Sequence, residues 1–160
     1  MTNLTTNNND AIMHASVKVK KLTKTAIIPT YGTKNSAGAD LYADISGRTM
    51  IPPHATLMIK TGIALEIEES FVGLIYARSG IASKRGLAPA NKVGVIDSDY
   101  RGEIMVALHN HTNDAQFIDP GERIAQIVFT KYFIGSLEEV EDFETETERG
   151  EGGFGSTGTK

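Results

Sequence analysis

The 160-residue sequence contains no cysteine. This absence excludes disulfides, thiolate zinc sites and a cysteine nucleophile, and it fits a reducing compartment such as the cytoplasm. No apolar run approaches the roughly 18 residues that a membrane-spanning helix requires, so no membrane partner is expected. The first ten residues are rich in Asn and Thr and lack the basic start and apolar stretch of a secretory signal. We therefore predict a cytoplasmic protein.

Neither sign of charge dominates the sequence. There are 16 Lys and Arg residues against 20 Asp and Glu residues, a formal net charge of -4. This balance is too close to neutral for a protein that wraps nucleic acid, so no nucleic-acid partner is expected. Residues 138–148 hold seven acids and no base, whereas residues 1–137 hold 14 bases and 12 acids. The mildly basic body is compatible with binding a small polyanion, and equally with an ordinary mixed surface.

The sequence contains many short runs in which apolar and polar residues alternate, and no window of a dozen residues shows an equally good helical pattern. The apolar positions with this period of two are Val17, Val19, Leu57, Ile59, Ile63, Leu65, Ile67, Ile104, Val106 and Leu108. Residues 71–77 form a nearly continuous apolar run, which is typical of a strand covered on both faces. Turn-forming pairs such as Ser46-Gly47 and Asn113-Asp114 separate the runs. The sequence predicts an all-β, jelly-roll-like domain with at most one short helix, near residues 81–85.

Composition divides the chain into three parts. We expect residues 1–15 to be a loose N-terminal arm and residues 16–137 to be the β jelly-roll domain. Residues 138–160 consist of an acidic run followed by a glycine-rich segment, and neither can bury an apolar face. We therefore expect this last part to be a linker and a flexible tail that orders only when a ligand supplies contacts.

The segment 93–102 combines an apolar strand with a turn that holds two carboxylates and an aromatic ring. Asp97 lies at the end of the strand, where partial desolvation would suit a general base acting on water. The alternative is a plain hairpin, because Asp and Gly are common turn residues. A calcium loop is excluded, because Arg101 stands where an oxygen ligand is required.

Two other segments hold groups that bind phosphate. Residues 78–80 place a guanidinium, a hydroxyl and freely directed backbone N–H groups directly after an apolar strand. A turn with one exposed Arg is the alternative there. Residues 149–158 combine a guanidinium, an aromatic ring and hydroxyls among glycines, and could close over a ligand or serve as a flexible linker. They are not a P-loop, because no Lys follows Gly155 and no helix can follow so close to Lys160.

His109 and His111 would share one face of a strand, which makes a metal pair conceivable. No third ligand of the usual type lies nearby in the sequence, so a solvated strand end is the better interpretation, and no protein metal ligand is predicted. The patterns Gly-x-Ser-x-Gly and His-Glu-x-x-His are both absent, which removes support for two large hydrolase mechanisms.

Five segments in order resemble the motifs of the trimeric dUTP diphosphatase family, the dUTPases. They read AGADLYA at 37–43, ARSGIA at 77–82, NKVGVIDSDYRG at 91–102, PGERIAQ at 120–126 and RGEGGFGSTG at 149–158. One such motif would be weak support for the family. Five in the family's order form a strong resemblance that extends from residue 37 nearly to the end of the chain.

The resemblance implies a magnesium-dependent homotrimer of jelly-roll subunits that hydrolyses dUTP to dUMP and pyrophosphate. It assigns Asp97 as the general base that activates the water attacking the α-phosphorus. Tyr100 matches the residue that packs against deoxyribose, where a ribose 2′-hydroxyl would clash. The magnesium ion is expected to bind mainly through the triphosphate, with Asp40 at most in its outer shell. Each site is expected to combine groups from three subunits.

The resemblance also implies three groups of substrate contacts. Uracil is read by the backbone around Gly94, Val95 and Ile96 with Asn91, and Met105 is a further substrate contact. The phosphates are cradled by Arg78, Ser79, Gly80 and Gln126. The closing tail contributes Arg149, Phe154, Gly155, Ser156 and Thr157, with Phe154 stacked on uracil.

Two alternatives to a dUTPase remain from the sequence. One is a relative of dCTP deaminase, which has the same fold, although the complete fifth motif and Tyr100 argue against it. The other is a non-enzymatic nucleotide-binding regulator, which an intact Asp97 and tail disfavour. Release of ammonia from dCTP, or binding of dUTP without release of pyrophosphate, would identify these alternatives.

Overall fold

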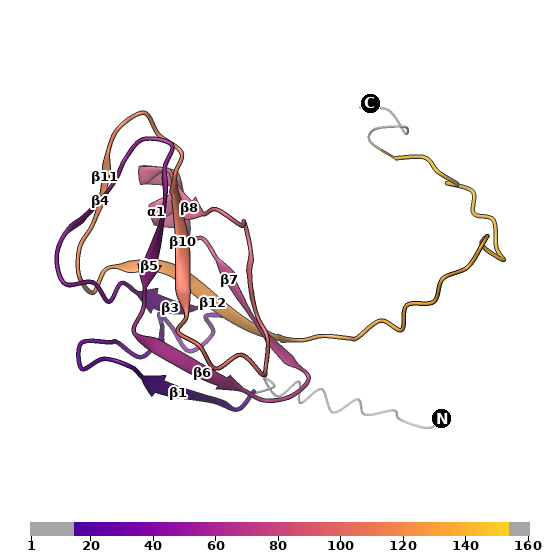
Figure 1. Cartoon of the computed structure of the whole chain (residues 1–160), viewed down its shortest axis with the longest axis horizontal. Helices are drawn as coiled ribbons and strands as arrows, with labels where there is room; N and C mark the ends of the chain where they lie inside the picture. The colour runs from indigo at the N-terminus through magenta and orange to yellow at the C-terminus, as the bar shows by residue number, and fades with distance from the viewer. Residues whose placement is uncertain (1–14, 154–160) are drawn as a thin grey trace, which may run out of the picture.

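The computed structural model describes residues 15–153, and its body is built from β-strands (Figure 1). The largest sheet has five strands in the order β2-β3-β12-β7-β9, and each neighbouring pair is antiparallel. Its strands are β2 (Thr30–Tyr31), β3 (Ala39–Tyr42), β12 (Arg123–Lys131), β7 (Phe71–Tyr76) and β9 (Gly94–Ile96). The sheet therefore joins segments that lie far apart in the sequence.

Three smaller antiparallel sheets complete the body. One has three strands in the order β5 (Thr56–Lys60), β10 (Met105–Asn110) and β8 (Leu87–Pro89). The others are pairs: β1 (Val17–Lys21) with β6 (Ile63–Ile67), and β11 (Gln116–Ile118) with β4 (Thr49–Ile51). The all-β fold with one short helix, as predicted from the sequence, is confirmed for the described residues.

The core follows from the period-two pattern of the strands. In β10, Val106 and Leu108 are buried, whereas Met105 at the start of the strand faces out. The largest fully buried side chains are aliphatic: Leu41, Ile51, Ile59, Ile63, Leu65, Leu87, Ile104, Leu108, Ile118, Ile124, Ile127 and Val106. Each stabilises the fold by about 1.5–3 kcal/mol relative to exposure, so the sheets are held together mainly by these contacts.

Two buried polar side chains fix loops to the core. The Asn110 amide donates hydrogen bonds to the carbonyl oxygens of Ile51 (3.1 Å), Pro52 (3.1 Å) and Asp114 (2.8 Å). The Thr61 hydroxyl donates to the carbonyl of Ile104 at 2.5 Å. Because a buried polar group without a partner is costly, these bonds define the loop positions as well as stabilising them.

The helix α1 (Ser79–Arg85) confirms the short helix predicted near residues 81–85 and begins two residues earlier. It follows Arg78, whose backbone is extended, and ends at Gly86, whose φ of 61° lies in the left-handed region that glycine tolerates. Ile81 is its buried residue. In residues 15–153 no helix has the length and hydrophobicity to cross a bilayer.

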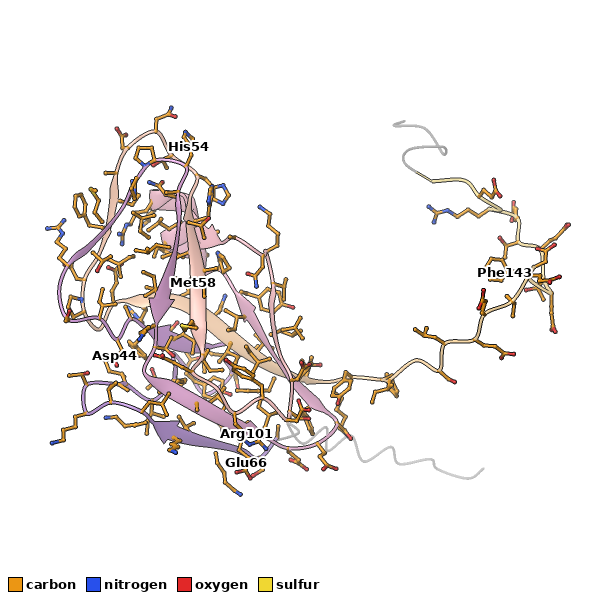
Figure 2. The ribbon with its side chains drawn as sticks, in the orientation of Figure 1. Asp44, His54, Met58, Glu66, Arg101 and Phe143 are labelled. Carbon is orange, nitrogen blue, oxygen red and sulfur yellow. The ribbon has the colours of Figure 1, made fainter. Side chains whose placement is uncertain are left out.

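After β12 the chain leaves the body as an extended segment (Figure 1). Residues 132–153 contain no helix or strand. The side chains of Phe133, Ile134 and Leu137 are 99%, 85% and 97% exposed, and Phe143, labelled in Figure 2, is 86% exposed. A single copy of the described chain therefore leaves a series of large apolar side chains uncovered, which soluble proteins normally avoid.

Candidate active site

β12 brings three of the sequence motifs together. In its two ladders Gln126 pairs with Asp40 on β3 and with Tyr76 on β7. β7 leads directly through Ala77 into Arg78 at the start of α1. A cavity of about 640 Å³, which we call the α1 cavity, opens at this point. All four residues expected to cradle phosphate line it: Arg78, Ser79, Gly80 and Gln126.

A buried carboxylate organises the cations of the α1 cavity. Asp40 is 8% exposed, and its Oδ1 accepts a hydrogen bond from Arg78 Nε at 2.6 Å. Its Oδ2 accepts a second bond from Arg123 Nη1 at 3.3 Å. Two guanidinium groups around one carboxylate leave a net positive charge at the cavity wall, and guanidinium geometry suits phosphate oxygens. Arg123 was not among the residues assigned a role from the sequence, although it lies in the fourth motif.

The Gln126 amide is held from two sides. Its Nε2 donates a hydrogen bond to the Ala77 carbonyl at 2.9 Å. A Cβ atom at Gly38 would lie 2.5 Å from Gln126 Oε1 and 3.1 Å from its Cδ, closer than side-chain contacts allow. A methyl group at Gly38 would therefore have to displace the Gln126 amide, whereas glycine leaves room for this amide at the cavity.

A second cavity, of about 210 Å³, lies beside the 91–102 segment and is called the hairpin cavity. It is lined by Met58, Val95, Ile96, Asp97, Tyr100, Glu103 and Met105. The structure thus brings the expected base together with four of the expected substrate contacts. Met58, from β5 and labelled in Figure 2, and Glu103 were not identified from the sequence.

The Asp97 side chain is exposed in the single chain. The partial desolvation expected at the end of the strand is therefore wrong for one chain alone, because β9 is a three-residue strand at the edge of its sheet in the described residues. Any desolvation of this carboxylate has to come from a bound ligand or a neighbouring molecule.

Asn91 and Gly94 lie next to the hairpin cavity without lining it. Asn91 is exposed, and its carbonyl accepts a hydrogen bond from the Val93 N–H at 2.7 Å. Gly94 is buried, and a Cβ there would lie 3.2 Å from Ile75 Cβ and 3.4 Å from Asn91 Nδ2. These contacts fix the start of β9 against β7 and bring the Asn91 amide close to it.

The two cavities lie at opposite ends of β7. β9 runs antiparallel to β7 with Gly94 opposite Ile75 and Ile96 opposite Gly73, so Asp97 falls near Val72. Arg78 follows the other end of β7. At about 3.3 Å per residue from position 72 to position 78, the two backbones are separated by about 20 Å. One chain therefore cannot direct Asp97 and Arg78 at the same small group.

The tail residues are only partly described. Arg149 donates from Nε to the Gly152 carbonyl at 2.8 Å and is exposed on the extended segment. Phe154, Gly155, Ser156 and Thr157 lie outside the described residues. Figure 1 shows that the described end of this segment lies far from the sheets of its own chain. The structure therefore does not bring Arg149 to either cavity.

In residues 15–153 no group of three or more His, Asp and Glu side chains could hold a metal ion. The rings of His109 and His111 do meet, with centroids 4.4 Å apart in an edge-on arrangement. His109 Nδ1 shares a hydrogen bond of 2.9 Å with the Thr56 hydroxyl. Each carboxylate oxygen of Asp40 accepts a hydrogen bond from an arginine, so both oxygens are already paired with cations.

Comparison with known proteins places the chain among close relatives. A family model described as dUTPase matches residues 24–158. The deoxyuridine 5′-triphosphate nucleotidohydrolase of Desulfitobacterium hafniense is 47% identical over 148 residues, which cover 89% of this chain and 97% of that protein. The protein of the same name from Nautilia profundicola is 48% identical over 144 residues, covering 89% and 98% respectively.

Solved structures agree with the sequence comparison. A variant of Staphylococcus bacteriophage 80alpha dUTPase with dUpNHpp matches with a TM-score of 0.81 and 31% identity, covering 89% of this chain and 98% of that one. A variant dUTPase from phage phi11 of S. aureus, whose structure describes a structural Mg(II) ion, matches with a TM-score of 0.72 and 26% identity. It covers 81% of this chain and 99% of that one.

The antiparallel β fold, the cationic α1 cavity and these relatives together define the class of protein as a hydrolase. Within that class the chain belongs to the dUTPase family. The family and the fold inferred from the five motifs are both confirmed.

The first prediction concerns the contact between Gly38 and Gln126. Replacing Gly38 by Ala should push the Gln126 amide away from the Ala77 carbonyl and lower kcat/KM for dUTP about tenfold. Tenfold corresponds to about 1.4 kcal/mol, the size of one hydrogen bond. Pyrophosphate release under steady-state conditions measures the effect.

Gly32→Ala is the matched control, because a Cβ at Gly32 would meet only Ser36 Oγ, at 3.7 Å, although Gly32 also lines the α1 cavity. Equal activity of the two alanine variants would contradict a steric role for Gly38.

Proposed function

We propose that this chain hydrolyses dUTP to dUMP and pyrophosphate. The observation that carries the proposal is the placement of the expected base and sugar contact in one cavity and of the expected phosphate cradle in another, within a chain of the dUTPase family. The relatives named deoxyuridine 5′-triphosphate nucleotidohydrolases and the phage enzyme solved with dUpNHpp support the same substrate.

Asp97 is proposed as the general base. It is exposed at the rim of the hairpin cavity, so a water molecule can reach its carboxylate. A base must lie within hydrogen-bond reach of the water whose proton it accepts, directly or through one further water. Asp97 would accept that proton as the water attacks the α-phosphorus, and Tyr100 on the same turn would pack against the deoxyribose.

The edge of β9 is proposed to read uracil. β9 is the last strand of its sheet and pairs only with β7 in the described part of the chain, so its outer backbone N–H and C=O groups have no strand partner. The backbone from Gly94 to Ile96, together with the Asn91 amide, can hydrogen-bond the base as another strand would. Cytosine presents the reverse donor and acceptor pattern, so buried polar groups would be left mispaired and it would be rejected strongly.

The α1 cavity is proposed to bind the phosphates. Arg78 and Arg123 supply charge, Gln126 supplies an amide, and the first backbone N–H groups of α1 have no acceptor within the helix. We propose Mg²⁺ as the metal, bound mainly through the triphosphate, because Asp40 is already engaged by two arginines and suits an outer-shell position. Bound there, the ion would neutralise charge on the phosphates.

Completion of the site by other subunits follows from the separation of the two cavities. Asp97 and Arg78 of one chain lie about 20 Å apart along β7, which supports a site in which the Asp97 of one copy meets the Arg78 of another. The exposed apolar side chains of residues 133–137 also require cover that a second copy can supply. We therefore propose that every active site is shared between subunits, and the resemblance to the trimeric dUTPases makes a homotrimer the proposed assembly.

We also propose the domain boundaries, the role of the tail and the location that the sequence predicts. Residues 138–160 form the linker and tail, and Arg149, Phe154, Gly155, Ser156 and Thr157 close over a site on another subunit. Residues 16–137 form the catalytic domain, residues 1–15 the N-terminal arm, and the protein acts in the cytoplasm.

A panel of nucleotides tests the proposed reaction. With Mg²⁺ present, dUTP should give pyrophosphate and dUMP in equal amounts, whereas dCTP, dTTP and UTP should react at least about a hundredfold more slowly. Ion-exchange chromatography of the products, with a parallel assay for ammonia, distinguishes the alternatives. Ammonia from dCTP would identify a deaminase, and tight binding of dUTP without turnover would identify a regulator.

A substitution tests the base. Asp97→Asn should fold normally and bind dUTP, yet lower kcat about a hundredfold or more, because the amide cannot accept the proton. Asp99→Asn is the matched control, since Asp99 lies in the same turn, is exposed and does not line the hairpin cavity. If Asp97→Asn kept near-normal kcat while Asp99→Asn lost it, the base would be Asp99.

A further inference from the structure

The Tyr100 ring lies over Gly102, two residues further along the chain. A Cβ atom at Gly102 would lie 2.5 Å from Tyr100 Cζ and 3.0 Å from its Cε2, and would also meet the phenol oxygen. Gly102 is not among the glycines with positive φ in the described residues. An added Cβ at this position would therefore have to displace the Tyr100 ring, and no special backbone conformation calls for glycine here.

The far end of the Tyr100 ring is fixed to a well-anchored piece of backbone. The phenol hydroxyl donates a hydrogen bond to the Glu103 carbonyl at 3.2 Å. Glu103 is itself held, because its Oε1 accepts a bond from the Gly62 N–H at 3.0 Å. The neighbouring Ile104 N–H donates to the Ile63 carbonyl at 2.8 Å. The turn between β5 and β6 thus holds in place the residue, Glu103, whose carbonyl accepts the hydrogen bond from Tyr100.

The backbone of Tyr100 belongs to the same turn as the proposed base, Asp97. The Tyr100 N–H donates to the Asp97 carbonyl at 3.2 Å. Arg101 closes the turn from outside, donating from Nη1 to the carbonyls of Ser98 at 2.6 Å and Tyr100 at 3.1 Å. The ring is 42% exposed and lines the hairpin cavity.

We propose that Gly102 is a positioning residue that determines sugar selectivity. By lacking a Cβ it allows the Tyr100 ring to lie back against the backbone, with its hydroxyl on the Glu103 carbonyl, and so fixes the wall of the hairpin cavity. The proposal rests on the proposed function, in which Tyr100 packs against deoxyribose. A methyl group at Gly102 displaces the ring, breaks its hydrogen bond and removes that fixed wall.

A double-mutant cycle tests the proposal. The ratio of kcat/KM for dUTP to that for UTP is measured for the parent protein, Gly102→Ala, Tyr100→Ala and the double variant. Tyr100→Ala should lower this ratio about tenfold or more, the size of one steric discrimination. Gly102→Ala should lower it several-fold in the parent protein and leave it unchanged in the Tyr100→Ala protein, because the methyl group then has no ring to displace.

Gly47→Ala is the matched control, because Gly47 has no atom within 4 Å of an added Cβ and lies outside both cavities. It should keep the parent ratio. Tyr100→Phe separates the two contacts of the ring, since it keeps the packing on Gly102 and removes the bond to Glu103. A ratio between those of the parent and Gly102→Ala is expected.

The outcomes separate the role of Gly102 from that of Tyr100. If Tyr100→Ala lowers the ratio and Gly102→Ala does not, the role of Gly102 is wrong and the role of Tyr100 stands. If Gly102→Ala lowers it equally in both backgrounds, the effect does not pass through the ring and the inference is overturned. If Tyr100→Ala leaves the ratio unchanged, the sugar contact and the inference are both wrong. Should Gly102→Ala fail to fold, recovery of folding in the double variant supports the contact, and failure of both overturns it.

Discussion

The position of β12 between β3 and β7 is the constraint on which the rest of the structure depends. It aligns Gln126 with Asp40 on one side and with Tyr76 on the other, and so brings three segments distant in sequence to one cavity. The same sheet places β9 on the outer side of β7, running antiparallel, so the turn with Asp97 points to the opposite end. This strand order therefore places the proposed phosphate-binding residues and the proposed base at opposite ends of β7. The proposal that active sites are shared between subunits rests on this strand order and direction.

Charge and steric room then determine how the side chains on these strands and turns are arranged. The buried Asp40 would be costly alone, and its two arginine partners make it tolerable while leaving a cationic wall for an anion. Two glycines act through their missing Cβ atoms, Gly38 beneath the Gln126 amide and Gly102 beneath the Tyr100 ring. At each position the absent Cβ leaves room for a side chain of the proposed site. Rigid placement of this kind is what a site requires when most of the catalysis comes from orientation and electrostatics.

The sequence revealed the local features and the family, but not the contacts between distant segments. Alternation at residues 63–67 and 104–108 identified strands, and Gly86 after a run that starts at Ser79 agrees with a helix that ends there. Asp97 and the residues expected to bind phosphate were identified from the motifs. The pairing of Gln126 with Asp40, and the presence of Met58 and Tyr100 at one cavity, depend on tertiary register that no local pattern encodes. The exposure of Asp97 was missed for the same reason, because a strand end in sequence does not show what covers it.

Subunit mixing tests the central claim, that Asp97 and Arg78 of one active site come from different chains. Asp97→Asn and Arg78→Ala chains, each nearly inactive alone, are unfolded, combined in equal amounts and refolded. Random assembly gives about a quarter of the sites both native residues, so about a quarter of the parent activity should return. Native mass spectrometry confirms that mixed oligomers have formed. If mixed oligomers form and activity stays at the level of the separate variants, both residues serve a site within one chain, and a site shared between subunits is wrong for this protein.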